Sequence, residues 1–166
     1  MKSLILGLLV ATTAGCAGIR KSLAYDPTVG FREYERYEWA TDAAGVRDSE
    51  DRLAIRTEFD GHLKDLGYEW VSANPDFLLH LHLGPDGIDF PAAYRALSYR
   101  PSPNLPVNLD GRSYPADALV FDVIDRDSRE LVWRGTATRV FDAQTGRFVR
   151  MKLGVEIIMR DFPPQD

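Results

Sequence analysis

The strictest pattern in this 166-residue chain lies at residues 76–83, where large apolar side chains occupy every second position. A repeat of two is typical of a β-strand, because successive side chains point to opposite faces of a sheet. One face of this strand carries Phe77, Leu79, Leu81 and Leu83. The other face carries Leu78, His80 and His82. We therefore expect a half-buried strand with one apolar face and one polar face.

The residues before this strand predict a helix. Glu50 and Asp51 suit a first turn, where acidic side chains meet the positive end of the helix dipole. Apolar side chains then recur at spacings of four, four and three residues, at Ile55, Phe59, Leu63 and Leu66. Gly67 follows as a typical left-handed terminator. The pattern predicts a helix over residues 49–66 with one apolar side.

An aromatic-rich segment at residues 31–39 predicts the first strand, with Tyr37 and Trp39 on one face. The predicted helix separates this segment from the strand at residues 76–83. Crossovers of this kind are right-handed and join parallel strands. We therefore expect the two strands to run parallel if they are neighbours in the sheet.

Residues 117–124 and 130–141 predict a hairpin, with a turn rich in Asp and Ser between its strands. Trp133 shares a face with Leu131 in this pattern, so we expect its indole in the core. The alternative is that Trp39, Trp70 and Trp133 line a ligand cleft, but large aromatic side chains on strands belong more often to a core.

A second helix follows the hairpin. Its apolar side chains recur at helical spacing, at Phe148, Met151, Val155, Ile158, Met159 and Phe162. Pro163 and Pro164 end it. Between the central strand and the hairpin, residues 84–115 hold six of the ten prolines. That density excludes a regular helix, so we expect a long loop or a partly ordered insertion.

The order strand, helix, strand, insertion, hairpin, helix predicts an α+β fold. We expect a mostly antiparallel sheet with two helices packed on one face, in a single domain over residues 25–166. The net charge of −5 and the lack of a basic run argue against a nucleic-acid partner. A single cysteine excludes a disulfide framework.

The N-terminal residues have the pattern of a signal peptide over residues 1–15. Lys2 precedes an apolar run that is about half the length needed to span a bilayer. The string TAGC at residues 13–16 resembles the lipobox of bacterial lipoproteins, which implies that Cys16 carries diacylglycerol and becomes the first residue. Residues 16–24 then form a lipidated tether. The alternative is an ordinary signal peptide with an incidental cysteine.

Four short motifs occur in a fixed order, at residues 37–39, 66–68, 75–76 and 131–135. Together with the lipobox they resemble the DUF4136 family of bacterial lipoproteins over nearly the whole mature chain. The resemblance implies this fold and a place in the cell envelope. It brings no established activity or catalytic residue. As in lipoprotein sorting of enteric bacteria, Ala17 in place of Asp implies the outer membrane, facing the periplasm.

Two groups of side chains suggest metal chemistry. His80 and His82 point to one face of a strand and offer two nitrogen ligands for zinc or copper. A third ligand is needed, and neither His62 nor Asp89 has a spacing that forces convergence. We therefore expect the two histidines to form the polar face of the strand, with no metal site. Oxygen ligands for calcium are also present, at Asp122, Asp125, Asp127 and Glu130. EF-hand spacing is absent, and a hairpin turn explains these residues.

The chain has no nucleophile elbow, Walker loop or dinucleotide fingerprint. We expect no enzyme, no catalytic residue and no cofactor, but a non-enzymatic interaction or structural module of the cell envelope. Its partners are then the membrane, through the lipid, and an envelope protein. The alternatives are a binding module for a small apolar or lipid ligand, and a metal-assisted enzyme. Tyrosine and arginine are enriched in interface hot spots. We therefore place partner contacts in the insertion, at Tyr94, Arg95, Tyr99, Arg100 and Tyr114.

Overall fold

The computed structural model describes residues 18–40, 50–83, 94, 98–106, 115, 117–142, 144–145 and 147–164. Its strands are β1 (Arg20–Tyr25), β2 (Arg36–Trp39), β3 (Glu69–Trp70), β4 (Phe77–Leu83), β5 (Arg100–Pro101), β6 (Leu119–Asp125), β7 (Glu130–Thr138), β8 (Phe141–Asp142) and β9 (Arg147–Phe148). Its helices are α1 (Glu50–Asp65) and α3 (Met151–Met159). Among these residues, no helix has the length and apolar character needed to cross a membrane.

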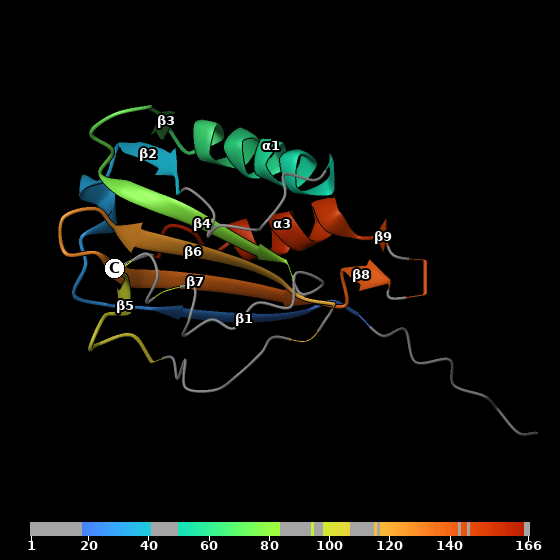
Figure 1. Ribbon diagram of the computed structural model, residues 1–166. Helices are drawn as coiled ribbons and strands as arrows, with labels where there is room; N and C mark the ends of the chain where they lie inside the picture. The colour runs from blue at the N-terminus through green and yellow to red at the C-terminus, as the bar shows by residue number, and fades with distance from the viewer. Residues whose placement is uncertain are drawn as a thin grey trace, which may run out of the picture.

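The strands form a mixed, mostly antiparallel sheet in the order β1-β7-β6-β4-β2-β3 (Figure 1). β4 pairs antiparallel with β6, and β6 and β1 both pair antiparallel with β7. β2 pairs parallel with β4 across the connection through α1, which confirms the expected parallel pair. The predicted α+β fold, its hairpin and its two helices are therefore correct.

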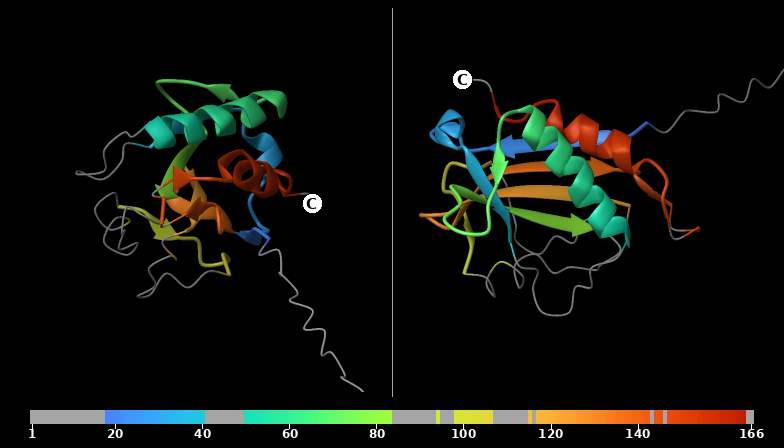
Figure 2. Two further views of the ribbon diagram at one scale, coloured as in Figure 1. Left: turned by 90° about the vertical axis from the view of Figure 1, so that its right-hand side faces the viewer. Right: turned by 90° about the horizontal axis from the view of Figure 1, so that it is seen from above.

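Both helices cover the same face of the sheet, called here the helix face (Figure 2). Apolar side chains of β4, β6 and β7 meet those of α1 and α3 in one aromatic-rich core. Phe59 of α1 stacks on Phe121 of β6 with ring centroids 3.9 Å apart. Asp60 of α1 accepts hydrogen bonds from the Tyr37 hydroxyl at 2.8 Å and the Trp39 indole at 2.9 Å. These two bonds hold α1 against β2.

The opposite side of the sheet, called here the insertion face, is covered by part of the expected insertion. Tyr94 and Leu105 from that segment pack with residues of β6 and β7 in a second, smaller core. The Ser102 backbone N–H donates to the Leu131 carbonyl at 3.0 Å, and the Ser102 hydroxyl donates to the buried carboxylate of Asp26. The described part of the insertion is thus an ordered layer on the sheet.

The sheet starts earlier than we expected. Residues 20–24, which we assigned to a tether, belong to β1, and β1 pairs with β7 from Arg20 opposite Thr138 to Tyr25 opposite Trp133. The sequence RKSLAY shows no clear alternation because β1 is an edge strand, and all six of its side chains are exposed or only partly buried. Its order comes from its partner strand.

Two further details differ from the sequence prediction. The predicted strand at residues 31–39 is a 3₁₀ turn over Phe31–Glu33 followed by the short β2. The turn contributes an aromatic ring to the core, since Phe31 is buried and packs edge-on against Phe162. In the hairpin, Val123 lies opposite Trp133 but Ile124 lies opposite Leu131. This bulge puts Trp133 in the helix-face core, as expected, and Leu131 in the core of the insertion face.

Candidate functional site

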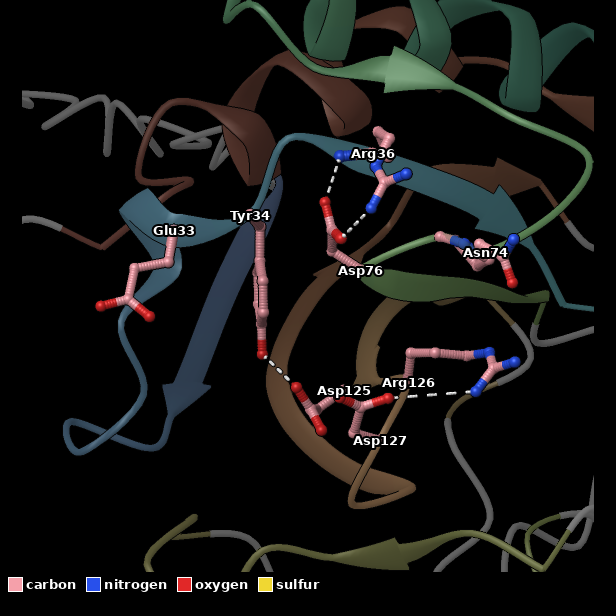
Figure 3. Close-up of a pocket in the computed structure, with 9 residues that line it drawn as sticks. Glu33, Tyr34, Arg36, Asn74, Asp76, Asp125, Arg126 and Asp127 are labelled. Carbon is pink, nitrogen blue, oxygen red and sulfur yellow. Dashed lines mark hydrogen bonds and ion pairs between the residues drawn. The ribbon is translucent and has the colours of Figure 1, made fainter.

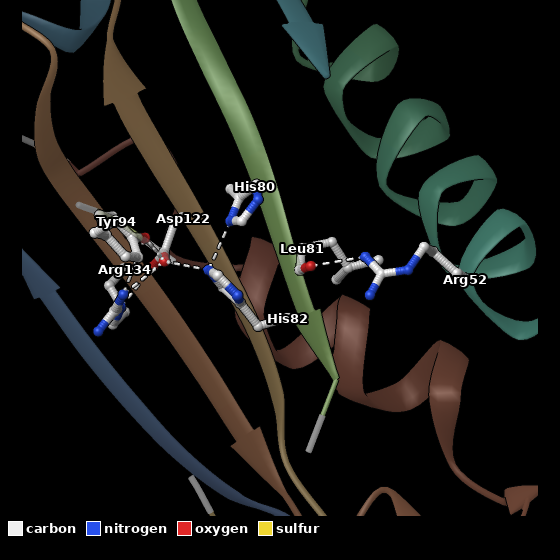
Figure 4. Close-up of polar contacts among 7 residues, drawn as sticks. All are labelled: Arg52, His80, Leu81, His82, Tyr94, Asp122 and Arg134. Atoms are coloured by element: carbon white, nitrogen blue, oxygen red, sulfur yellow. Dashed lines mark hydrogen bonds and ion pairs between the residues drawn. The ribbon is translucent and has the colours of Figure 1, made fainter. Parts of the chain in front are cut away.

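A cluster of buried polar side chains lies on the insertion face at the centre of the sheet (Figure 4). Its members are His80, His82, Asp122, Arg134 and Tyr94, called here the buried polar cluster. The strand register assembles it, because β4 places His80 opposite Asp122 and β7 places Arg134 opposite Asp122. Side chains on opposed positions share a face, so four of the five members converge without any loop.

An ion pair forms the centre of this cluster. The Arg134 guanidinium donates through Nε to Asp122 Oδ1 and through Nη2 to Asp122 Oδ2, both at 2.6 Å. The Tyr94 hydroxyl donates to Asp122 Oδ2 and accepts from Arg134 Nη2 at 3.1 Å. Such two-pronged geometry is the strongest arrangement of a carboxylate with an arginine. Tyr94 therefore closes the pair from the insertion side.

The charges of this pair follow from its surroundings. Burial alone would raise the pKa of Asp122, but the positive charge of Arg134 and hydrogen bonds from Arg134 and His82 hold that pKa well below its usual value. Burial and the negative charge of Asp122 raise the pKa of Tyr94 well above its usual value. At neutral pH the cluster thus contains a carboxylate, a guanidinium and an un-ionised phenol.

The two histidines extend the cluster along β4. His80 Nδ1 lies 2.8 Å from His82 Nε2, and His82 Nε2 lies 3.2 Å from Asp122 Oδ2. Burial, and next the neighbouring His82, lower the pKa of His80 to about 3, while burial also lowers the pKa of His82. Two ring nitrogens at 2.8 Å hold one hydrogen between them, so this arrangement fits a neutral pair.

The histidine face differs from the half-buried polar face that we expected. His80 is 4% exposed and His82 is 2% exposed, and the ring of Tyr94 packs against both imidazoles. In the part of the chain that the structure describes, no group of three or more His, Cys, Asp or Glu side chains is arranged to hold a metal ion. The oxygens of Asp122 are engaged by Arg134 and Tyr94. His62 belongs to α1, on the other side of the sheet.

A buried arginine on the helix face donates a hydrogen bond to the backbone of β4. Arg52 of α1 donates through Nη1 to the Leu81 carbonyl at 2.8 Å (Figure 4). β2 pairs with β4 only at residues 77–79, and the Ala40 N–H then reaches the Leu79 carbonyl. Leu81 lies beyond that pairing, where a buried carbonyl needs another donor. We assign Arg52 this structural role.

An open, acidic pocket lies at one end of the sheet, where β2 and β4 begin and β6 turns into β7 (Figure 3). Its volume is about 460 Å³. Its lining is Glu33, Tyr34, Arg36, Asn74, Pro75, Asp76, Asp125, Arg126 and Asp127. We call it the acidic pocket.

The two inner carboxylates of the acidic pocket hold the backbone in place. Asp76 accepts from the backbone N–H groups of Glu35 at 3.0 Å and Arg36 at 2.8 Å, and from the Arg36 guanidinium at 2.9 Å. Asp125 accepts from the Tyr34 hydroxyl at 2.8 Å and the Ser128 N–H at 2.7 Å. Burial would raise both pKa values, but these hydrogen bonds lower them.

These contacts decide how the acidic residues near the hairpin are used. Asp125 fixes the turn, as the turn interpretation requires. Asp122 belongs to the buried polar cluster, and the side chain of Asp127 is almost wholly exposed. The three aspartates therefore have separate partners instead of a common centre.

The residues that we assigned to partner contact have different fates. Tyr94 is only 3% exposed, and its hydroxyl is bonded within the buried polar cluster, so its side chain does not lie on the described surface. Tyr99 is half-buried beside it, and the exposed Arg100 pairs with Glu130 at 2.9 Å. Arg95, Tyr114 and the lipidation candidate Cys16 lie outside the described residues.

The sequence analysis missed the ion pair of Asp122 with Arg134. A signal for it exists: each strand of the predicted hairpin carries one charged side chain within an apolar run, and the two charges have opposite signs. A lone charge inside an apolar strand is expected only where a partner meets it.

Two solved structures of bacterial proteins are similar to this fold. A DUF4136 family protein from Bacteroides thetaiotaomicron superposes with a TM-score of 0.58 at 13% identity, covering 87% of this chain and 94% of that one. A PDZ domain protein from Parabacteroides distasonis gives a TM-score of 0.53 at 11% identity, covering 89% of this chain but 37% of that one. No curated protein sequence matches the chain. The family model "Domain of unknown function (DUF4136)" matches residues 22–164, and the chain therefore belongs to the DUF4136 family.

Proposed function

We propose that this protein is a lipid-anchored component of the bacterial cell envelope, held at the outer membrane by diacylglycerol on Cys16 and facing the periplasm. The string TAGC at residues 13–16 carries this proposal. β1 begins at Arg20, four residues after Cys16. Four extended residues span about 14 Å. An anchor on Cys16 thus keeps the folded body close to the membrane surface.

The test of this anchor is the variant Cys16→Ser, expressed in a bacterium that processes lipoproteins. Radiolabelled palmitate is expected to enter the wild-type protein and not the variant. Thr13→Leu is the matched control: the lipobox usually has leucine or another aliphatic residue at this position, so this variant should keep the label. Palmitate in the Cys16→Ser protein would contradict the proposal.

The body of the protein then acts as a non-enzymatic interaction module for another envelope protein. The buried polar cluster supports a non-enzymatic role. Its ionisable side chains Tyr94, Asp122 and Arg134 are buried and hydrogen-bonded to one another. Tyr99 and Arg100 are the described residues of the predicted contact set that reach the surface, and we propose that the contact includes them.

A photo-crosslinking amino acid at position 100 tests this surface. We expect it to capture one envelope protein in intact cells, whereas the same group at the exposed position 32, on the 3₁₀ turn, should not capture that protein. Equal capture at both positions, or none at position 100, would place the contact elsewhere or remove it.

A second candidate function is a binding module for a small apolar or lipid ligand. A cavity of about 540 Å³ at the C-terminal end of α3 favours it. Its lining includes Leu23, Tyr25, Leu66, Trp133, Met159 and Phe162. This volume is within the range of about 300 to 1,000 Å³ that is usual for small-molecule sites. We call it the β1–α3 cavity.

A further inference from the structure

The sheet has a long open edge at β1. This strand is the last in the strand order and pairs with β7 through all six of its residues (Figure 1). Among the residues that the structure describes, no strand pairs with the other side of β1. At its other end the strand order closes with β3, which has only two residues. An open edge is a template for a further strand, and proteins usually protect it.

Three residues of β1 present their backbone groups at this edge. The N–H of Asp26, directly after β1, donates to the Val132 carbonyl of β7 at 2.8 Å. The backbone groups of successive residues in an antiparallel strand point alternately toward and away from the partner strand. Every second residue before Asp26 therefore also faces β7. The residues between them, Lys21, Leu23 and Tyr25, direct their N–H and C=O groups away from the sheet.

β1 lacks the features that usually protect an edge strand. It contains no proline, and its register with β7 is continuous along all six residues, without a bulge. A lysine on an edge strand normally repels an incoming strand. The ammonium of Lys21, however, pairs with Asp161, which follows α3. This charge is therefore engaged within the molecule.

The open edge of β1 is complementary to a second copy of itself. In an antiparallel pair, two residues that face each other with their backbone groups exchange two hydrogen bonds. With Leu23 on a two-fold axis, it faces its own copy, and Lys21 faces Tyr25, so all three outward residues form both bonds. An axis at Ser22 leaves Tyr25 without a partner in β1, and an axis at Ala24 does the same to Lys21. An axis at Lys21 puts two like charges opposite each other, which is unfavourable.

The side chains agree with the register centred on Leu23. On the helix face, this register places the aliphatic stem of Lys21 beside the ring of Tyr25 from the second copy. Tyr25 is 39% exposed, so its ring has apolar surface to bury there. On the other face, Arg20 lies opposite the acidic Asp26 of the second copy, and opposite charges on facing positions are favourable.

We propose that β1 pairs antiparallel with β1 of a second copy of this chain, with Leu23 on the two-fold axis, so that two sheets join into one. Two-fold dimers with the same surface on both subunits are the commonest oligomers. One pair of strands makes a small interface, so the dimer belongs to the weak, concentration-dependent class. The inference is independent of the lipid anchor and of the partner contact proposed at Arg100, because it uses other residues.

Single cysteines test the register, in the full chain with Cys16→Ser, which has no other thiol. Leu23→Cys puts two thiols at the axis, where the Cα atoms of facing residues lie about 5.5 Å apart, within reach of a disulfide. Ser22→Cys is the matched control, because its two copies lie diagonally, about 7 to 8 Å apart. Under mild oxidation, Leu23→Cys is expected to give at least about five times as much disulfide dimer as Ser22→Cys. Equal yields, or a higher yield from Ser22→Cys, would overturn the proposal.

Sedimentation equilibrium tests the association itself. The mass of the Cys16→Ser chain is expected to rise from monomer toward dimer between about 10 μM and about 1 mM. Lys21→Pro in that chain removes an N–H that points away from β7, and its ring obstructs a second strand, so this variant should stay monomeric. Lys21→Ala is the matched control: it loses the same charge, keeps the N–H and should still dimerise. Equal melting temperatures of the two variants show that β1 keeps its place beside β7. A monomeric Cys16→Ser chain at all concentrations, or equal dimerisation of the two variants, would overturn the proposal.

Discussion

The two faces of one sheet solve the problem of burial in opposite ways. On the helix face, β4, β6 and β7 bury aromatic and aliphatic side chains against α1 and α3. On the insertion face, the same three strands bury two histidines and an ion pair of Asp122 with Arg134. Neighbouring residues of each strand therefore lie in environments of very different polarity.

This difference teaches what each face contributes to the fold. Apolar burial is non-directional and accepts many side chains of similar size. A buried ion pair stabilises only where its geometry is met, and a slip of one residue would move every member to the other face. We expect the helix face to supply most of the free energy of folding and the insertion face to specify the register of β4, β6 and β7.

The largest effect is expected from Asp122→Ala, which leaves the buried Arg134 without its carboxylate. We predict a loss of about 3 to 5 kcal/mol in the free energy of unfolding. Urea denaturation measures it. Asp127→Ala is the control, because that carboxylate is almost wholly exposed, and it should change stability little. A small loss for Asp122→Ala would mean that the ion pair is not needed.

On the helix face, Gly135→Ala should cost about 3 kcal/mol, at the upper end of overpacking effects. The new methyl would meet Trp133 at 2.4 Å and Ile158 at 2.6 Å, and both are core side chains. Gly61→Ala is the matched control: its methyl meets nothing within 4 Å, and alanine should stabilise α1 by about 1 kcal/mol. Equal melting temperatures of the two variants would contradict the tight packing of the helix face.

The histidines of the insertion face predict a dependence on pH. The pKa of His80 is lowered to about 3 in the folded protein, against about 6.5 when unfolded. The unfolded chain therefore binds more protons between these values, and stability falls as the pH drops below about 6.5. From pH 7 to pH 5, His80 accounts for a loss of about 2 kcal/mol.

Asp122 does not disturb this window, because its lowered pKa makes stability fall only below the unfolded value of about 3.9. His80→Gln should therefore reduce the loss between pH 7 and pH 5 by about 2 kcal/mol. His62→Gln, on the other side of the sheet, should leave the loss unchanged. Chemical denaturation at both pH values compares the three proteins, and an unchanged loss in His80→Gln would show that His80 titrates normally.

The smallest effect is expected from Tyr94→Phe, which removes one hydroxyl from the buried polar cluster. The ion pair keeps its two direct hydrogen bonds, so the loss should be about 1 kcal/mol. Tyr99→Phe, in the same segment, is the control and should have a smaller effect. A loss from Tyr94→Phe as large as that from Asp122→Ala would make the hydroxyl essential to the ion pair.

The sequence predicted the helix face well because its signals are local. The alternation at residues 77–83 and the helical spacing in α1 each describe one buried side of one element. The insertion face was not predictable in the same way. Burial of His80 depends on Asp122 and Arg134 of other strands and on the covering Tyr94. The residues that make these contacts are distant from residue 80 in sequence, so no periodic pattern near residue 80 indicates them.

The candidate sites also differ in whether their contacts are local in sequence. The turn function of Asp125 follows from residues adjacent in sequence, and the sequence predicts it. The β1–α3 cavity joins β1, the end of α1 and the end of α3, and it depends on a strand that the sequence did not reveal. The buried indole nitrogen of Trp133 has no acceptor among the described residues, and this follows from three-dimensional packing alone.

The pairing of β1 with β7 also has a consequence for the order of folding. Arg20 lies opposite Thr138, so the contact closes a loop of 118 residues. Contacts between distant segments slow folding, because the chain must lose its loop entropy before these contacts form. During synthesis β1 emerges long before β7 exists. The first strand to be synthesised therefore cannot pair within the sheet until nearly the whole domain has been made.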